Sequence, residues 1–415
     1  MSTRPRRWVA TAVAAATLPL VSCDDGRSAD LGQDTPETAA TDRGAVARQL
    51  LTRLEGALRT GDAEAAAALA APGVRSARQE LGRMTANAAR LRLRGLDLRY
   101  LSDSATTLTQ PQRQRWGDEA WVADVEVAWR YGGVDKAGSA LTIPVAMTST
   151  EQRPHLLSAD LPQAERLPLW LEDEVRVARG ASAVAVTTTN HSPQEFLGYA
   201  QRAGQTVRAS LPAWAGVLCV EVPRDQASFR DVAGVPQRQA AAIAAVTTTP
   251  DGTTTEGAPQ HVFVNPKLFG PLGTEGRQIV LSHEAAHVAL GAALLDVPMW
   301  LSEGIADYVA LAQSTTPVDV LAAQILEQVR ENGPPGALPG GAEFDGSDKR
   351  IGAWYEAAWL AVRLIADSYG DDALWRFYRQ SVRDEGSAAA FREVLGVSQR
   401  EFVRAWRSHL VALAG

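Results

Sequence analysis

The chain has 415 residues, a formal net charge of −7 and only two cysteines, Cys23 and Cys219. A chain this acidic, without a basic stripe, is not expected to bind nucleic acid, and it has no general attraction to anionic lipid. Two cysteines exclude a disulfide-rich scaffold, and Cys219, in an apolar run, is expected to be a small buried residue. The length predicts two domains.

The first 22 residues have the layout of a signal peptide. A basic start, Met1–Arg7, precedes an apolar, Ala-rich run, Trp8–Val21, which is too short to predict a membrane span. The ending Leu20-Val21-Ser22-Cys23 resembles the bacterial lipobox, in which the cysteine is acylated; the alternative is an ordinary cleaved signal with a chance cysteine. This resemblance implies an exported protein that lipid on Cys23 anchors to the outer face of the cytoplasmic membrane.

Residues 23–43 are polar and acidic without an apolar period, and they are predicted to form a flexible tether. Residues 44–189 begin with a helical pattern over Ala45–Arg90 and continue with period-two runs, which predicts an α+β domain. The expected strands are Leu96–Leu101, Ala120–Tyr131, Leu141–Met147, Trp170–Val177 and Ala181–Thr188. The pattern is similar to the cone-shaped nuclear-transport-factor-like fold. Its tryptophans are expected to pack in the core rather than to line a pocket.

Residues 190–415 are predicted to form a second domain. It begins with a helix over Ser192–Ser210, followed by strands at Gly216–Val222, Ala240–Thr247 and His261–Asn265. From there the pattern is helical to the end of the chain, apart from the Gly- and Pro-rich loop Asn332–Gly341, and loops of that kind are often functional.

The stretch His283-Glu284-Ala285-Ala286-His287 lies within an uninterrupted run of helix formers, Gln278–Leu290. The four-residue spacing places both imidazoles on one helix face, where they can share a zinc ion. Glu284 then lies beside the open position of the metal. The other interpretation is a pair of histidines on a solvated helix face.

Two acidic residues follow within Met299–Ala310. Ser302 is expected to cap a helix, on one face of which Glu303 and Asp307 lie four residues apart. A catalytic zinc site has three protein ligands and one open position, so Glu303 is the natural third ligand. Asp307 is placed to accept the second N–H of a ligating histidine. The alternative is an acidic first turn favoured by the helix dipole.

The HEAAH stretch followed by Trp300–Ala306 resembles the gluzincin branch of zinc metallopeptidases, which includes thermolysin and the zinc aminopeptidases. The resemblance covers roughly residues 190–415. The fifteen residues between His287 and Glu303 are fewer than in either group, and the chain has no Gly-x-Met-Glu-Asn exopeptidase motif. The resemblance implies a zincin-like domain with a helical C-terminal subdomain and one zinc ion per chain.

The same resemblance assigns two further roles. It implies that Tyr355 donates to the oxyanion, although a tyrosine at helical spacing also packs half-buried in many helices. It implies that the strand His261–Asn265 is the sheet edge that pairs with an extended substrate; the alternative is an ordinary strand inside the sheet.

These patterns predict a membrane-anchored, extracytoplasmic zinc metallopeptidase that hydrolyses peptide or protein substrates. Glu284 is the expected general base for a zinc-activated water. One alternative is a binding or scaffolding lipoprotein whose zinc domain is inactive or structural. Another is a zinc hydrolase of a non-peptide amide, such as a cell-wall link.

Overall fold

The computed structural model describes residues 42–150, 153–161, 164, 166–344, 350–383 and 387–415. The predictions of a signal peptide, of a lipid on Cys23 and of a tether up to residue 41 fall outside these residues. Asp42–Gly415 form one unit by their contacts. The expected boundary between residues 189 and 190 stays a prediction.

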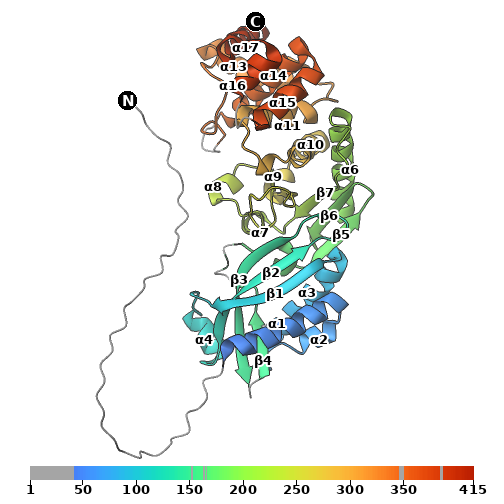
Figure 1. Cartoon of the computed structure of the whole chain (residues 1–415), viewed down its shortest axis with the longest axis vertical. Helices are drawn as coiled ribbons and strands as arrows, with labels where there is room; N and C mark the ends of the chain where they lie inside the picture. Colours follow the sequence, from blue (N-terminus) through green and yellow to red (C-terminus); the bar gives the residue numbers. More distant parts are fainter. Residues whose placement is uncertain (1–41, 151–152, 162–163, 165, 345–349, 384–386) are drawn as a thin grey trace, which may run out of the picture. The chain divides into compact units, whose positions relative to one another are not determined.

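The first half of this unit is built on an antiparallel sheet in the order β1-β2-β3-β4, with helices packed against it (Figure 1). The helix α1 starts after Asp42, whose carboxylate accepts the Ala45 N–H, and stops at Gly61, where φ is 72°. The expected order of helices and then strands is confirmed, while the likeness to the cone-shaped fold stays a prediction. The elements are α1 (Arg43–Thr60), α2 (Ala63–Ala67), α3 (Arg75–Leu91), β1 (Arg94–Asp103), α4 (Gln110–Trp116), β2 (Trp121–Arg130), β3 (Ser139–Thr150) and β4 (Arg153–Ser158).

A second, five-stranded mixed sheet follows in the order β5-β6-β7-β9-β8. The β6–β7 and β7–β9 pairs are parallel, and the two outer pairs are antiparallel. Its strands are β5 (Val175–Arg179), β6 (Ala183–Thr188), β7 (Leu218–Val222), β8 (Ala245–Thr248) and β9 (His261–Val264). The strands β5 and β6, expected to continue the first sheet, therefore belong to the second one.

The expected strand Trp170–Val177 is only partly correct. Leu169–Glu172 form a short helix, α5, and β5 begins at Val175. Pro168 precedes this helix, and the adjacent apolar side chains Leu169, Trp170 and Leu171 are all buried, so consecutive positions face the core rather than alternate ones. The expected core use of Trp170 is nevertheless confirmed, because the side chain is 0% exposed.

The two faces of the second sheet contact different hydrophobic cores. Val220 and Val222 of β7 pack into the cluster that contains the helices α6 and α10, whereas Cys219 packs into the cluster of the first sheet. This division follows from the period of two along a strand. Cys219 is buried as expected, on the face that points away from α10.

The prediction that the strand His261–Asn265 forms the edge of its sheet is wrong. The strand β9 lies between β7 and β8, so β8 forms the edge of the sheet. The reason is topological: after β8 the chain forms a polar loop and returns antiparallel to it, so that Val246 pairs with Phe263 and Val262 pairs with Val220 of β7.

The rest of the unit is mainly helical. Most of these helices pack around the core that contains α10, whereas α7 and α8 pack into the core of the first sheet. Trp300 of α11 lies 6.1 to 6.3 Å, between ring centroids, from Phe377, Phe391 and Phe402, which fixes α11 against the last helices. The helices are α6 (Pro193–Ser210), α7 (Gln226–Ala233), α8 (Gln237–Ala240), α9 (Pro266–Phe269), α10 (Thr274–Leu290), α11 (Met299–Ala310), α12 (Val318–Leu321), α13 (Ala323–Asn332), α14 (Ile351–Tyr369), α15 (Asp371–Arg383), α16 (Ala388–Leu395) and α17 (Gln399–Ala414).

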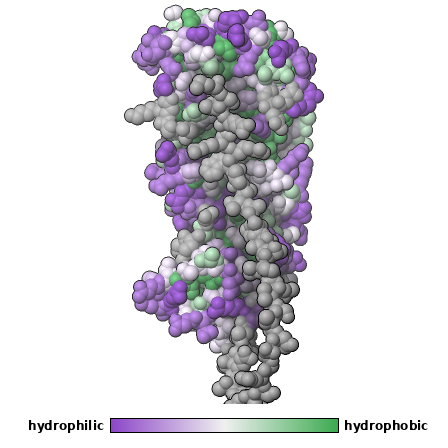
Figure 2. Space-filling model, turned by 60° about the vertical axis from the view of Figure 1, so that its left-hand side comes forward, coloured by the Kyte–Doolittle hydropathy of each residue, from purple (hydrophilic) through white to green (hydrophobic). Residues whose placement is uncertain are grey.

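Much of the coloured surface in Figure 2 is hydrophilic, with small, separate hydrophobic areas. The large hydrophobic side chains that are exposed in the described part of the chain are likewise scattered: Leu101, Met299, Val320, Tyr369 and Val411. Scattered residues of this kind are usual on a protein surface. Among the described helices, none is both long and apolar enough to cross a membrane.

Candidate metal centre

The helix α10 carries both histidines of the HEAAH stretch on one face. It runs without interruption from Thr274 to Leu290 and ends at Gly291, whose φ is 68° and whose N–H donates to the carbonyl of His287. The Nε2 atoms of His283 and His287 lie 3.0 Å apart, and their rings are 77° from coplanar. The predicted convergence of the two imidazoles is confirmed by this geometry.

The helix α11 brings Glu303 to the same point. Its Oε2 lies 3.2 Å from Nε2 of His283 and 3.4 Å from Nε2 of His287. Gly304 allows α11 to lie close to α14, because a Cβ at this position would be 2.5 Å from the carbonyl oxygen of Ala358. Gly304 therefore permits the close contact between α11 and α14, and the adjacent Glu303 is held at the position where it meets the two histidines.

The expected N-cap at Ser302 is wrong. The helix α11 begins at Met299, after Pro298, so Ser302 lies inside its first turn and is buried. The proline fixes the chain direction into the helix without a side-chain cap. The four-residue spacing of Glu303 and Asp307 is unaffected, because both lie within the helix.

Asp307 fixes the proton of His283. Nδ1 of this histidine lies 2.8 Å from Oδ1 of Asp307 and, as an N–H, donates to it, which turns Nε2 towards Glu303 and His287. A lone pair and a carboxylate oxygen 3.2 Å apart repel each other unless a proton or a cation lies between them.

The charges of the site fit a metal ion. Although burial opposes the shift, Asp307 and Glu303 raise the pKa of His283 well above its ordinary value, so the two carboxylates favour a positive charge here, and a metal ion would supply it in place of the proton on Nε2. Burial also opposes ionisation of Glu303, but His287 and His283 lower the pKa of its carboxyl group. The three ligand atoms lie within 4.8 Å of one another. Two imidazole nitrogens and a carboxylate are a zinc-binding donor set, and the residues present therefore fit zinc.

Glu284 faces the same site from the turn between the two histidines. It is buried, and its Oε2 accepts a hydrogen bond of 2.7 Å from the hydroxyl of Thr247 on β8. The same hydroxyl lies 3.0 Å from the main-chain oxygen of Glu284. The sequence analysis missed Thr247, because only the folded chain brings the edge strand against α10.

Tyr355 reaches the site from α14. Its ring centroid lies 6.0 Å from that of His283. Burial, and then the charges of Glu303, Asp307 and Glu284, raise its pKa well above the ordinary value, so the phenol keeps its proton and can donate it in a hydrogen bond. The structure thus places Tyr355 beside the candidate ligands, and its role as a donor stays a prediction.

A small cavity adjoins the site. Its volume is about 260 Å³, and the predicted site residues in its wall are His283, Glu284, Asp307 and Tyr355. Ala242–Ala245, the segment that leads into the edge strand β8, also line the cavity. Segments from both sheet and helix therefore enclose a space beside the candidate ligands.

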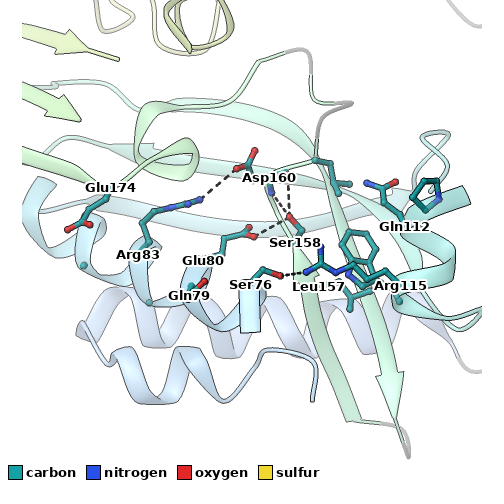
Figure 3. A pocket seen from close by; sticks show the side chains of 15 residues that line it. Ser76, Gln79, Glu80, Arg83, Gln112, Arg115, Leu157, Ser158, Asp160 and Glu174 are labelled. Carbon is teal, nitrogen blue, oxygen red and sulfur yellow. Dashed lines mark hydrogen bonds and ion pairs between the residues drawn. The ribbon is translucent and has the colours of Figure 1, made fainter. Parts of the chain in front are cut away.

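A larger cavity, of about 850 Å³, lies between α3, α4 and β4 (Figure 3). Its wall carries charges of both signs, and several are already paired within the protein. Glu80 accepts from the Ala159 N–H over 2.6 Å, and Arg83 lies 3.9 Å from Asp160. The sequence analysis expected no chemical site in this part of the chain, and these internal pairings leave the cavity without a group that points to one ligand.

No family model and no curated protein matches the chain. Among solved structures, the chain has some similarity to a mutant of an M1 zinc metallopeptidase from Deinococcus radiodurans bound to a Tyr-Ser-Ala substrate. The identity is 15% and the TM-score 0.33, over 56% of this chain and 51% of that one, so the match spans about half the length of each protein.

Proposed function

We propose that the chain is a zinc metallopeptidase of the gluzincin type, with zinc held by His283, His287 and Glu303. The observation that carries this proposal is the convergence of three buried or half-buried ligand residues from α10 and α11, with Asp307 bonded to the outer nitrogen of His283. Among the described residues, no fourth His, Cys or carboxylate joins the group. Three protein ligands next to a cavity are typical of a catalytic site, because a water or a substrate can reach the remaining position on the metal.

A zinc ion in this position supplies Lewis acidity, since it lowers the pKa of a coordinated water towards ~7 and polarises the amide carbonyl. The protein supplies the proton transfers. Glu284 takes a proton from the attacking water and later gives it to the leaving amine nitrogen. Its Oε2 accepts from Thr247, and its Oε1 has no hydrogen-bond partner in the described part of the chain, so Oε1 is the oxygen that accepts the proton.

Other groups hold the substrate and stabilise charge. The phenol of Tyr355 keeps its proton and donates to the oxygen of the amide as negative charge develops there. The free edge of β8 is placed to pair with an extended substrate, because Ala242–Ala245 line the cavity on that side. Pairing of this kind uses main-chain hydrogen bonds, so we expect little sequence selectivity.

Metal-dependent cleavage tests this proposal. The full chain, supplied with zinc, is expected to cleave a mixed peptide library, to lose this activity with a chelator and to regain it when zinc is added. Cell-wall fragments assayed in parallel test the alternative of a non-peptide amide. Zinc bound at the site without cleavage of either substrate would contradict an enzymatic role and favour a binding or scaffolding lipoprotein.

We also propose that the protein is exported and anchored to the outer face of the cytoplasmic membrane by lipid on Cys23. Support comes from the basic start, the apolar run and the lipobox-like ending of the first 23 residues. Cys23→Ala is expected to move the protein from the membrane fraction to the soluble fraction. The same distribution for both proteins would contradict the anchor.

A further inference from the structure

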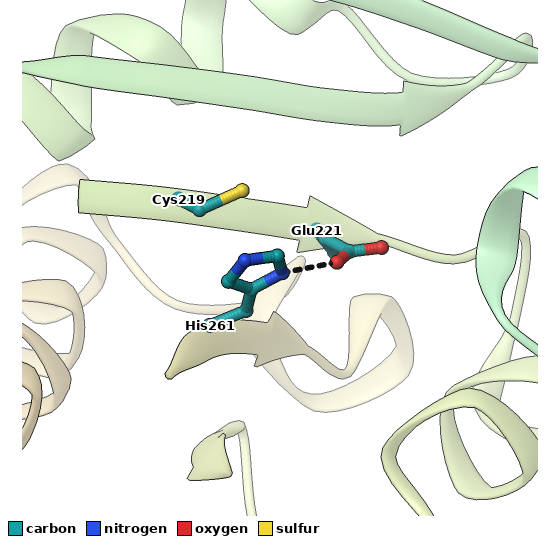
Figure 4. Close-up of side chains that lie close together, drawn as sticks. All are labelled: Cys219, Glu221 and His261. Atoms are coloured by element: carbon teal, nitrogen blue, oxygen red, sulfur yellow. Dashed lines mark hydrogen bonds and ion pairs between the residues drawn. The ribbon is translucent and has the colours of Figure 1, made fainter. Parts of the chain in front are cut away.

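A second group of metal-ligating side chains lies on the other face of the second sheet, away from α10. Cys219 and Glu221 are two residues apart on β7, so their side chains point to the same face. His261 comes from the neighbouring strand β9, one position before the register pair Val220 and Val262. Figure 4 shows the three side chains gathered between the strands, and their ligand atoms lie within 4.8 Å of one another.

Both ring nitrogens of His261 contact carboxylates. Nδ1 lies 2.6 Å from Oε1 of Glu221, and Nε2 lies 2.9 Å from Oδ1 of Asp135, in the turn after β2. The hydroxyl of Tyr131 donates to the other oxygen of Glu221 over 3.3 Å, and the Tyr131 N–H donates to Oδ2 of Asp135 over 2.7 Å. The group therefore joins β7 and β9 to the turn of the first sheet.

This group is sealed from water. Cys219 and His261 are 0% exposed, Glu221 is 1% exposed and the side chain of Asp135 is 3% exposed. Even with the imidazole fully protonated, one positive charge faces two carboxylates. The guanidinium of Arg166 senses the charge of Glu221 but donates to the carbonyls of Val232 and Thr249. The guanidinium of Arg179 likewise senses the charge of Cys219 and donates to main-chain carbonyls. Two carboxylates that share one imidazole in a site closed to solvent would be stabilised by a bound cation.

We propose that Cys219, Glu221 and His261 form a second metal site, which takes a zinc-like divalent ion for a structural purpose. A thiolate, an imidazole and a carboxylate are the donors that zinc uses in proteins, whereas the hard ions Mg²⁺ and Ca²⁺ prefer oxygen alone. One nitrogen of His261 binds the ion, and the other keeps a carboxylate partner, as metal-ligating histidines generally do.

The surroundings separate this site from the candidate catalytic centre. Cys219, Glu221 and His261 line neither the cavity beside α10 nor the one beside α3, and they are buried from solvent. An ion there would link the two sheets through β7, β9 and the Asp135 turn. Since the site is closed in the folded chain, the ion is expected to enter during folding.

Cobalt in place of zinc gives a direct test, because a cysteine thiolate bound to Co²⁺ produces a charge-transfer absorption in the near ultraviolet. The full chain carrying Cys23→Ser has Cys219 as its only cysteine. When this protein is expressed with added Co²⁺, we expect the band. We expect it also with His287→Ala added, which removes a ligand of the other site only. Cys219→Ser should abolish the band and lower the zinc content by about one ion per chain.

Two results would overturn the second site. One is the absence of the thiolate band in Cys23→Ser protein that contains cobalt; the other is a zinc content that Cys219→Ser leaves unchanged. X-ray absorption of zinc in the His287→Ala protein does not depend on how the Cys219 variant folds. We expect a sulfur neighbour at about 2.3 Å, whereas a shell of only nitrogen and oxygen would refute the site. Loss of metal with His287→Ala concerns the proposed peptidase centre alone, so the two proposals can fail separately.

Discussion

The two groups of potential metal-ligating side chains lie on opposite sides of the second sheet and differ in their access to a cavity. The group on α10 and α11 adjoins a cavity and has a glutamate, Glu284, that is free to move a proton. The group on β7 and β9 is fully buried, and its carboxylates are bonded to His261 and Tyr131. Similar donor atoms therefore suit the two different purposes proposed: a site beside a cavity can admit a substrate, whereas a site closed to solvent favours a structural role.

We expect the largest effect on peptide hydrolysis from a change to Glu284, the proposed proton acceptor of the open site. Glu284→Gln removes the proton acceptor but keeps the size of the side chain and the hydrogen bond with Thr247. We expect peptide hydrolysis to fall by roughly 10²–10⁴-fold with zinc content unchanged. Glu275→Gln, exposed on the same helix, is the matched control. Turnover by Glu284→Gln equal to that of the control would remove Glu284 from the mechanism.

A substitution in the buried group around His261 should instead change the stability of the fold. His261→Ala removes the group that links Asp135 and Glu221 and leaves two carboxylates in a site without water. We expect the free energy of unfolding to fall by about 3–5 kcal/mol, measured by urea denaturation. Adding Glu221→Gln to this variant should restore part of the loss, because it removes one of the unpaired charges. A change below about 1 kcal/mol would mean that the group contributes little to the fold.

Tyr355 lies beside the site on α10 and α11 and not beside the buried group, so its substitution should affect only the proposed peptidase activity. Tyr355→Phe keeps the ring and removes the hydroxyl, so we expect the turnover rate to fall by about 10²–10³-fold while KM and zinc content change little. Tyr369→Phe, at the exposed end of the same helix, provides the comparison. Equal turnover in the two variants would assign Tyr355 to packing.

Asp307 is expected to have the smallest of these effects. Asp307→Asn weakens the hydrogen bond that holds the Nδ1 proton of His283, so zinc affinity should fall by about 10- to 100-fold. Competition with a chelator of known affinity measures this change. Asp296→Asn, exposed before α11, is the control. Affinity that stays at the control level would show that His283 is oriented by other contacts.

The contrast also shows what sequence can predict. The candidate residues of the open site follow from spacing within two helices, because residues four apart on a helix share a face. The candidate ligands His283, His287 and Glu303, and the partner Asp307, could therefore be proposed without a structure. The approximate order of helices and strands is visible for the same reason. These patterns depend only on residues that are close together in the sequence, so they can be recognised without knowing the fold.

Features that depend on distant strands were missed or wrong. The edge position of β8, and with it the contact of Thr247 with Glu284, depends on the chain returning between β7 and β8. Cys219 was expected to be simply apolar, since His261 and Asp135 are far away in sequence and meet it only through the pairing of strands and the packing of two sheets. The error at Ser302 has a local cause instead. Ser is common at N-caps, so Ser302 was expected to be one, but α11 already begins after Pro298.

The most direct test of the peptidase proposal is the zinc content of the purified full chain compared with that of His287→Ala, by elemental analysis. The structure predicts that the variant loses about one zinc ion per chain, since one of three ligands is removed from the site on α10 and α11. Equal zinc content in the two proteins, or no zinc in either after incubation with the metal, would contradict a zinc centre at His283, His287 and Glu303.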